Sequence, residues 1–273
     1  VEPRLLDLAI VWGDAAMQPA FDPEIRRYSL STPTTEAPLM VSANAQDDAH
    51  DLFIADEPAF AGVPVAVAVP AAGTTVQVQV QDPVTNRSTA YELVILPDGF
   101  PTMRVVTRQE GVSPGHLLLN PSGAPHFAVV IDNNGVPVWI RETLRSATFT
   151  QHPNGQYSYN ERLATGDVTN TNERVLLDQE LQELDRLTVA APLTNTDSHD
   201  FLILPNGNYV FLSYEPVMHD GVLYEDSVVQ EVDAVTGEQV FQWTSWGAIP
   251  LEDKVWDNET DYAHINSVIL DDD

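Results

Sequence analysis

The sequence contains no cysteine, a single lysine and no apolar run long enough to cross a membrane. Without cysteine, the protein has no disulfide bond, no thiolate metal site and no cysteine nucleophile. A membrane helix needs about 18 consecutive apolar residues, and no stretch approaches that length. The sequence therefore predicts a fold without covalent cross-links and without a membrane-spanning helix.

Positive charge is also scarce, because 41 Asp and Glu residues face 12 Lys and Arg, for a net charge of −29. Such a field repels phosphate backbones and anionic lipid, so we expect neither nucleic acid nor a membrane as a partner. A solvated acidic surface is the simplest explanation of the charge, and it suits a saline or extracellular setting. The 43% hydrophobic content is enough for a real core, in two ordinary domains or one large all-β domain.

Helix-period apolar patterns are scarce, whereas short alternating runs bounded by Gly, Pro, Asn and Asp recur. Residues 74–82, 90–96 and 209–215 read as strands, and 227–243 as a hairpin with its turn at Thr236-Gly237. One helix-like stretch, residues 176–187, can equally be two strands around a turn. The pattern predicts an all-β protein.

Two prolines and a glycine interrupt the strands at residues 97–103 and predict a domain boundary there. Residues 1–97, with turn signals every 8–12 residues, suit a β-sandwich. The opening, which runs through "QPAFDPEIRRYSL", and the closing "YELVIL" resemble cadherin-like or immunoglobulin-like modules of bacterial exported proteins.

Residues 103–273 contain internal repeats. "HPNGQYSYNE" and "LPNGNYVFLSYE" superpose with a spacing of 52 residues, and residues 129–142 match 230–246. All-strand repeats of about 40–50 residues are typical of β-propeller blades. The second domain is therefore predicted to be a partial β-propeller of about three to four blades.

Two of the seven histidines share a repeated context. His199 and His264 each follow a Thr-Asp pair and precede an apolar segment that is predicted to be a strand. A single histidine at a strand start is commonly a structural residue that finds a hydrogen-bond partner. Because the placement recurs, we predict that both imidazoles converge on one pocket. His152 aligns with Leu204 in the repeat and not with His199, so it gains no such support. The other four histidines are predicted to be surface or packing residues, namely His50, His116, His126 and His219.

The segments "HDFLILPNGNYVFLSYE", "VQEVDAVTGEQVFQW" and "DYAHINSV" resemble, in order and wording, the bacterial arylsulfate sulfotransferases. The resemblance covers nearly the whole chain. It implies an exported, periplasmic or extracellular protein with a sandwich and a six-bladed propeller. It also implies transfer of a sulfuryl group from an aryl sulfate to a phenol without phosphoadenylyl sulfate or any other cofactor.

Carried over residue by residue, the resemblance implies that His199 and His264 line the channel and stabilise the transferring group, with Asn266 as a substrate-orienting residue. The family also uses an arginine in a "Ser-Ser-Arg" context and a later histidine, in a "Gln-His" context, that accepts the sulfuryl group. The resemblance places both beyond Asp273. We therefore expect the chain to be a fragment with little or no turnover of its own.

The chemistry fits these residue types. Sulfuryl transfer resembles phosphoryl transfer, whose loose transition state is helped mainly by positioning and electrostatic stabilisation. Imidazole can act as a nucleophile, donate a proton to the leaving oxygen or bind the sulfuryl oxygens. The predicted partners are thus small molecules, an aryl sulfate and a phenol, and no metal site is predicted. The sequence does not name an oligomeric state.

Three alternatives remain open at this point. Acidic segments such as "DNNG", "AQDDAHD" and "DDD" offer oxygen ligands for a calcium-binding adhesion protein, although none has the spacing of a calcium loop. A relative could keep the fold and bind a ligand without catalysis. Another propeller enzyme, such as a lyase or dehydrogenase, is a third possibility, but a Gly-rich nucleotide loop and a Gly-x-Ser-x-Gly elbow are both absent.

Overall fold

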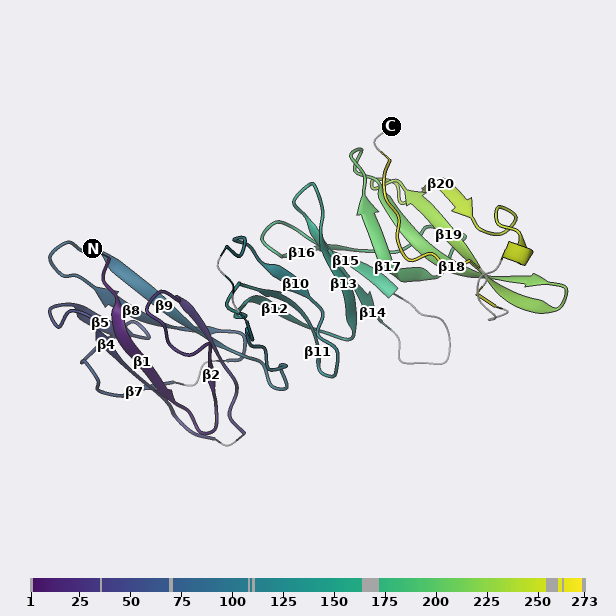
Figure 1. Ribbon diagram of the computed structural model, residues 1–273. Helices are drawn as coiled ribbons and strands as arrows, with labels where there is room; N and C mark the ends of the chain where they lie inside the picture. The colour runs from purple at the N-terminus through teal and green to yellow at the C-terminus, as the bar shows by residue number, and fades with distance from the viewer. Residues whose placement is uncertain are drawn as a thin grey trace. The chain divides into compact units, whose positions relative to one another are not determined.

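The computed structural model describes residues 2–34, 36–68, 71–107, 109, 111–163, 172–253, 260–261 and 263–271. Over these residues it has twenty β-strands and one short 3₁₀ helix, Leu251–Asp253 (Figure 1). The all-β prediction is confirmed. Nowhere in the described ranges is there a helix with the length and apolar character needed to span a membrane.

Contacts divide the chain into two units. The first comprises Val1–Leu117 and Val129–Ile140, and the second comprises Leu118–Ala128 and Arg141–Asp273. A three-stranded sheet, β10 (Leu117–Leu119), β11 (His126–Ile131) and β12 (Pro137–Thr143), has residues in both. The predicted boundary near residues 97–103 stays a prediction.

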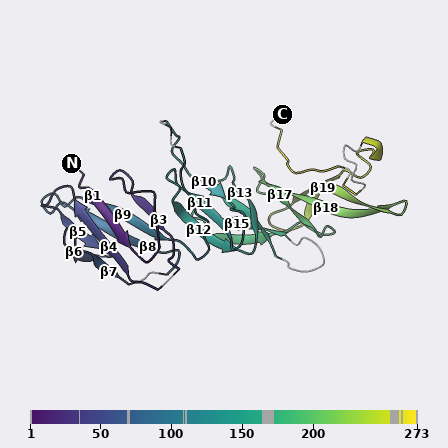
Figure 2. The same cartoon turned by 60° about the horizontal axis from the view of Figure 1, so that its bottom comes forward.

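The first unit contains two further sheets. One has the order β1-β4-β7, from Leu5–Val11, Leu39–Ala45 and Val65–Val67. The other has the order β2-β3-β9-β8-β5-β6, from Met17–Gln18, Arg27–Leu30, Ser88–Ile95, Thr75–Gln81, Asp51–Ile54 and Glu57–Ala59 (Figure 2). β3 and β9 run parallel, and the other pairs in these two sheets are antiparallel.

These strands form because their apolar residues alternate. In β8 the side chains of Val76, Val78 and Val80 are buried while the intervening glutamines face outward to different extents, as a period of two requires. The buried residues of both sheets belong to one hydrophobic cluster, in which Leu8 of β1 and Leu93 of β9 take part. These two sheets are thus held together by one apolar core.

The second unit contains two four-stranded antiparallel sheets in which the strand order follows the chain. The first is β13 (Ser146–Gln151), β14 (Tyr157–Arg162), β15 (Asn172–Leu177) and β16 (Glu183–Leu187). The second is β17 (Thr196–Ile203), β18 (Tyr209–His219), β19 (Val222–Val232) and β20 (Gln239–Thr244). The helix-like stretch 176–187 therefore forms parts of two strands around a turn.

The 52-residue repeat is visible in the hydrogen bonds of the turns. Between β13 and β14, Gly155 N donates to His152 O at 2.9 Å and His152 N donates to Gln156 O at 2.8 Å. Between β17 and β18, Gly207 and Leu204 make the same two bonds, at 2.9 and 2.8 Å. Both glycines have a positive φ, which L side chains rarely adopt. The repeated Asn-Gly dipeptide thus encodes the same turn twice.

One element differs from the sequence prediction. The apolar stretch after His264 was expected to be a strand, but residues 263–271 are not part of any strand. A strand requires a continuous ladder with a neighbour, whereas this segment is attached by single bonds, such as that from Ser227 Oγ to Ala263 O.

Candidate functional site

A bulge in β17 presents His199. Between the pairs Thr196↔Ser213 and Phe201↔Phe211 the chain takes five residue steps along β17 but only two along β18. The extra residues lie in residues 197–200, which we call the β17 bulge. Bulges interrupt the ladder and redirect side chains. The sequence Asp-Ser-His-Asp therefore presents its polar groups at a break in the sheet instead of in regular alternation.

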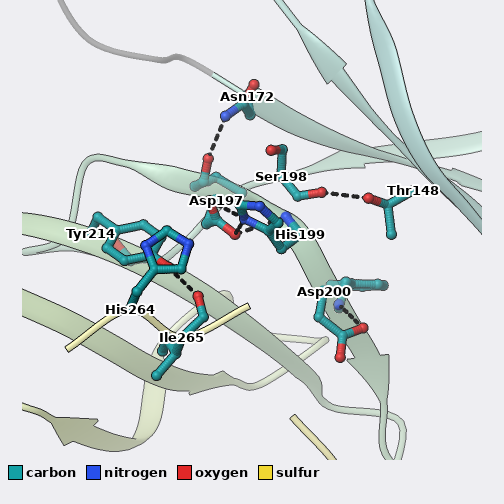
Figure 3. A network of polar contacts seen from close by, with 12 residues as sticks. Thr148, Asn172, Asp197, Ser198, His199, Asp200, Tyr214, His264 and Ile265 are labelled. Carbon is teal, nitrogen blue, oxygen red and sulfur yellow. Dashed lines mark hydrogen bonds and ion pairs between the residues drawn. The ribbon is translucent and has the colours of Figure 1, made fainter. Parts of the chain in front are cut away.

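The neighbouring sheet holds the backbone of this bulge. Asn172 Nδ2 donates to Thr196 O at 2.9 Å, and Thr148 Oγ1 donates to Ser198 O at 2.7 Å (Figure 3). Arg174 Nη2 lies 3.5 Å from Asp197 O, between these two contacts. The three successive carbonyls of Thr196, Asp197 and Ser198 thus face side chains from β13 and β15.

His199 is oriented by the carboxylate of Asp197. Its Nδ1 lies 2.9 Å from Asp197 Oδ1 and 3.2 Å from Oδ2, and its backbone N–H donates to Oδ1 at 2.8 Å. The Asp197 side chain is 10% exposed, whereas that of His199 is 45% exposed. A carboxylate that accepts from Nδ1–H fixes the tautomer with its lone pair on Nε2. The second ring nitrogen of His199 is therefore the one available to a ligand.

His264 repeats this arrangement. Its Nδ1 lies 2.7 Å from Asp261 Oδ2. Its ring stacks on Tyr214, with centroids 5.2 Å apart and an interplanar angle of 29°. Tyr214 Oη donates to the backbone carbonyl of Ile265, next to the histidine (Figure 3). Both predicted histidines therefore have the same carboxylate contact at the same ring nitrogen.

The two imidazoles lie side by side. Their centroids are 5.8 Å apart and the rings are nearly perpendicular, at 82°. Asp200 Oδ2 accepts a hydrogen bond of 2.9 Å from Val268 N, which ties the segment of His264 to the β17 bulge. The expectation that His199 and His264 converge on one pocket agrees with this placement, while their role in chemistry stays a prediction.

A polar cavity of about 330 Å³ opens beside both rings. Its lining is mostly polar and comprises Arg145, Ala147, Asn160, Arg162, Asn172, Asn195, Asp197, Ser198, His199, Tyr214, Glu225 and His264. Asn266, the predicted substrate-orienting residue, is exposed and is not among these lining residues. The structure thus brings the two histidines together and leaves Asn266 outside the cavity.

Burial shifts the pKa of several groups near the cavity. Burial, and then the charges of Asp197 and Asp261, raise the pKa of Tyr214, so its hydroxyl stays protonated. Burial and the charge of Arg174 lower the pKa of His152 to about 4. Burial lowers the pKa of Arg174 itself to about 10, a value at which the guanidinium is still charged at neutral pH. The wall next to the β17 bulge therefore carries a buried positive charge.

Sequence reasoning missed Arg145 and Arg162. The internal repeat contained the signal, because a shift of 52 residues places Arg145 on Asp197, Ala147 on His199 and Arg162 on Tyr214. All of these positions line the same cavity. The repeat predicted equivalent turns, but it also relates the two sides of the site.

A scan of the chain against protein-family models finds no match, and a search of curated proteins finds none either. Within the described ranges, no three His, Asp or Glu side chains gather in a way that could hold a metal ion. The titratable and charged side chains that line the cavity are imidazoles, carboxylates, arginines and a tyrosine.

Proposed function

We propose that the His199–His264 cavity binds an aryl sulfate and serves transfer of its sulfuryl group to a phenol, as part of an exported protein whose four-stranded sheets are blades of a β-propeller. One observation carries the proposal: two imidazoles 5.8 Å apart face one polar cavity, each with Nδ1 beside a carboxylate. The resemblance of the segments around both histidines to the arylsulfate sulfotransferases supports it.

The paired carboxylates suit both states of the imidazoles. When neutral, a ring that donates from Nδ1 presents a lone pair on Nε2. When protonated, it is stabilised by the carboxylate and donates from Nε2, either to a sulfuryl oxygen or to the leaving phenolic oxygen. Two such rings about 6 Å apart can contact different oxygens of one sulfate group. Both roles require Nε2 and not Nδ1.

The transfer itself breaks the bond between sulfur and the aryl oxygen. The departing phenolate takes a proton from an imidazolium. As the acceptor oxygen bonds to sulfur, the acceptor phenol gives its proton to the imidazole that has become neutral. If a histidine nitrogen bonds to sulfur first, the acceptor oxygen displaces that nitrogen in a second step, with the same proton transfer. Charge on the equatorial oxygens is stabilised by preorganised donors that need no rearrangement. The acceptor histidine and the arginine that the resemblance places elsewhere are not assigned to any residue of this chain.

Binding of 4-nitrophenyl sulfate, followed by calorimetry, tests the proposal together with release of 4-nitrophenol in the presence of phenol. We expect saturable binding to residues 1–273 and slow release. His199→Ala and His264→Ala should each weaken binding about tenfold, the effect of losing one charge-assisted hydrogen bond. His219→Ala is the matched control, because His219 is a half-exposed histidine beside a carboxylate, Asp220, and does not line the cavity.

Two outcomes would count against the proposal. One is the absence of binding at millimolar donor. The other is binding that the two cavity variants leave unchanged, or that His219→Ala weakens equally.

A further inference from the structure

The two faces of the sheet β13–β16 differ in whether their arginines form ion pairs. On one face, Arg186 contacts Glu161 at 2.8 Å, Glu173 at 3.4 Å and Glu183 at 2.8 Å. Arg141 of β12, a strand of another sheet, also pairs with Glu183. The charge of Arg186 on this face is therefore neutralised by glutamates of the same sheet.

The other face carries three arginines, Arg145, Arg162 and Arg174. Register places them together, because Arg162 lies opposite Asn172, Arg174 lies opposite Asn160, and Arg162 N donates to Arg145 O at 2.9 Å. Alternate side chains of a strand point to the same face, so the pair Arg162 and Asn172 lies on the same face as the pair Asn160 and Arg174. In the part of the chain that the structure describes, no carboxylate forms an ion pair with any of these three arginines.

Asn160 adds an unsatisfied donor to this face. Its side chain is 2% exposed and lines the cavity, and its Nδ2 has no hydrogen-bond partner among the described residues. Burial of an amide N–H without a hydrogen-bond partner is unfavourable, because the group has lost its bonds to water and gained none in return. A ligand that accepts from this amide would offset that loss.

We propose that Arg145, Arg162 and Asn160 form a subsite for a sulfate-type oxyanion on the wall of the cavity contributed by the sheet β13–β16. Two guanidinium groups and one amide offer several N–H donors to the oxygens of a tetrahedral anion, and guanidinium suits such oxygens by its geometry. Arg174 does not line the cavity but adds positive charge beside Asn160, its partner on the neighbouring strand. The subsite deepens the proposed function, because its ligand is the sulfate group of the proposed donor.

Negative charge collects elsewhere in the site. Asp197, Asp261 and Glu225 all act on Tyr214, and Asp197 is bonded to His199. Glu225 also lines the cavity and would repel an anion placed beside it. The arrangement is therefore polarised, with arginines on the β13–β15 wall and carboxylates around Tyr214. An anionic group fits beside the arginines, and a neutral hydroxyl group fits beside the carboxylates. The sulfate group of an aryl sulfate and the hydroxyl of an acceptor phenol have these two properties.

Titration of sodium sulfate against the chain, with chloride adjusted to constant ionic strength, tests the subsite. The readouts are calorimetry and the ¹⁵N signals of the Asn160 side-chain amide. We expect a saturable shift of that amide, and competition between sulfate and 4-nitrophenyl sulfate for one site. Arg145→Gln and Arg162→Gln should each weaken sulfate binding about tenfold, the effect of one charge-assisted hydrogen bond.

Arg87→Gln is the matched control, because it removes the same charge from an exposed arginine of the first unit. Equal weakening in this variant would show a general field effect and would overturn the subsite, as would the absence of a sulfate-dependent shift at Asn160. Arg145 is exposed, so its variant is expected to fold even if Arg162→Gln does not.

The two proposals can fail separately. Sulfate binding that depends on Arg145 while His199→Ala and His264→Ala leave aryl sulfate binding unchanged would contradict the proposed function alone. Binding of free sulfate without competition from the ester would show a site for the inorganic anion, and would overturn the assignment to the donor's sulfate group.

Discussion

The interiors of the two units differ in what they bury. Sixteen polar or charged residues are buried among those the structure describes, and of these only Ser29 and Thr89 lie in the first unit. The remainder, which include His152, Asn160 and Arg174, lie in the second unit. The first unit instead buries mainly apolar side chains, most of which belong to the one cluster between its two sheets.

This difference has a physical meaning. Burying a polar group is unfavourable unless it is hydrogen-bonded, and burying a charge is more so. The interiors of the two units therefore differ in composition. The first buries almost only apolar side chains, whereas the second also buries polar groups, of which Asn160, Asn172 and Asp197 line the cavity. Exceptions to the rules of packing are expected where a site is built.

The largest effect is expected in the apolar core. Leu93 is fully buried in β9, between β3 and β8, so Leu93→Ala leaves a cavity that the two sheets cannot close. We expect the free energy of unfolding to fall by about 3 to 4 kcal/mol, measured by urea denaturation. Leu6→Ala, at a 62% exposed position of β1, should change it by less than about 0.5 kcal/mol. Equal losses in the two variants would contradict this description of the core.

In the second unit, the buried histidine predicts a pH dependence. His152 has a pKa lowered from 6.5 to about 4. Between these values the unfolded chain binds a proton that the folded chain does not, so stability rises with pH and is lost as the pH falls. We expect about 2 to 3 kcal/mol over this window.

Denaturation of His152→Gln between pH 4 and 7 isolates the contribution of this histidine. Glutamine can still bond Ser158, the partner that His152 Nε2 contacts at 2.8 Å, but it does not titrate. The variant should therefore lose this part of the slope, while the many carboxylates titrate alike in both proteins. Parallel pH profiles for the two proteins would show that His152 is not the source.

A smaller effect is expected at the link between the two histidine segments. Asp200→Ala removes the acceptor of Val268 N–H. Protection of the Val268 amide from hydrogen exchange should fall about tenfold, since a bond to a charged acceptor is worth roughly 1.5–3 kcal/mol. Asp185→Ala, an exposed aspartate on β16, should leave that amide unchanged. Unchanged protection of the Val268 amide in Asp200→Ala would show that Asp200 does not hold the segment of His264.

The smallest effect contrasts two buried tyrosines. Tyr159 of the second unit is fully buried and its hydroxyl has no partner among the described residues, so Tyr159→Phe should raise stability by up to about 1 kcal/mol. Tyr91 of the first unit bonds Leu5 N, Arg26 Nη1 and Pro23 O. Tyr91→Phe should therefore lower stability by about 1 kcal/mol or more. Melting temperatures that shift in the same direction would contradict the contrast.

Periodicity predicted the strands well and the site only partly. The alternation of valine and glutamine in β8 and the Asn-Gly turns act locally, so the sequence predicts them without knowledge of the rest of the fold. The convergence of His199 and His264 was predicted because their Thr-Asp context recurs. In each case the sequence signal lies within a few residues of the position it describes.

The remaining features depend on register between distant strands. The β17 bulge is not visible in a pattern of apolar residues, because its polar sequence reads as a strand start. Whether Arg162 and Asn160 lie on the cavity face depends on which alternate residues of β14 point to that face. A register shift of one residue would have placed both on the opposite face. Asn266 was assigned by resemblance alone, and the structure places it outside the lining.

The most direct test of the central claim is a titration of 4-nitrophenyl sulfate followed by the ring ¹⁵N signals of all seven histidines. We expect the Nε2 signals of His199 and His264 to shift together and saturate at the same concentration, while those of buried His152 and half-exposed His219 stay in place. Saturable binding that leaves the His199 and His264 signals unchanged would contradict it.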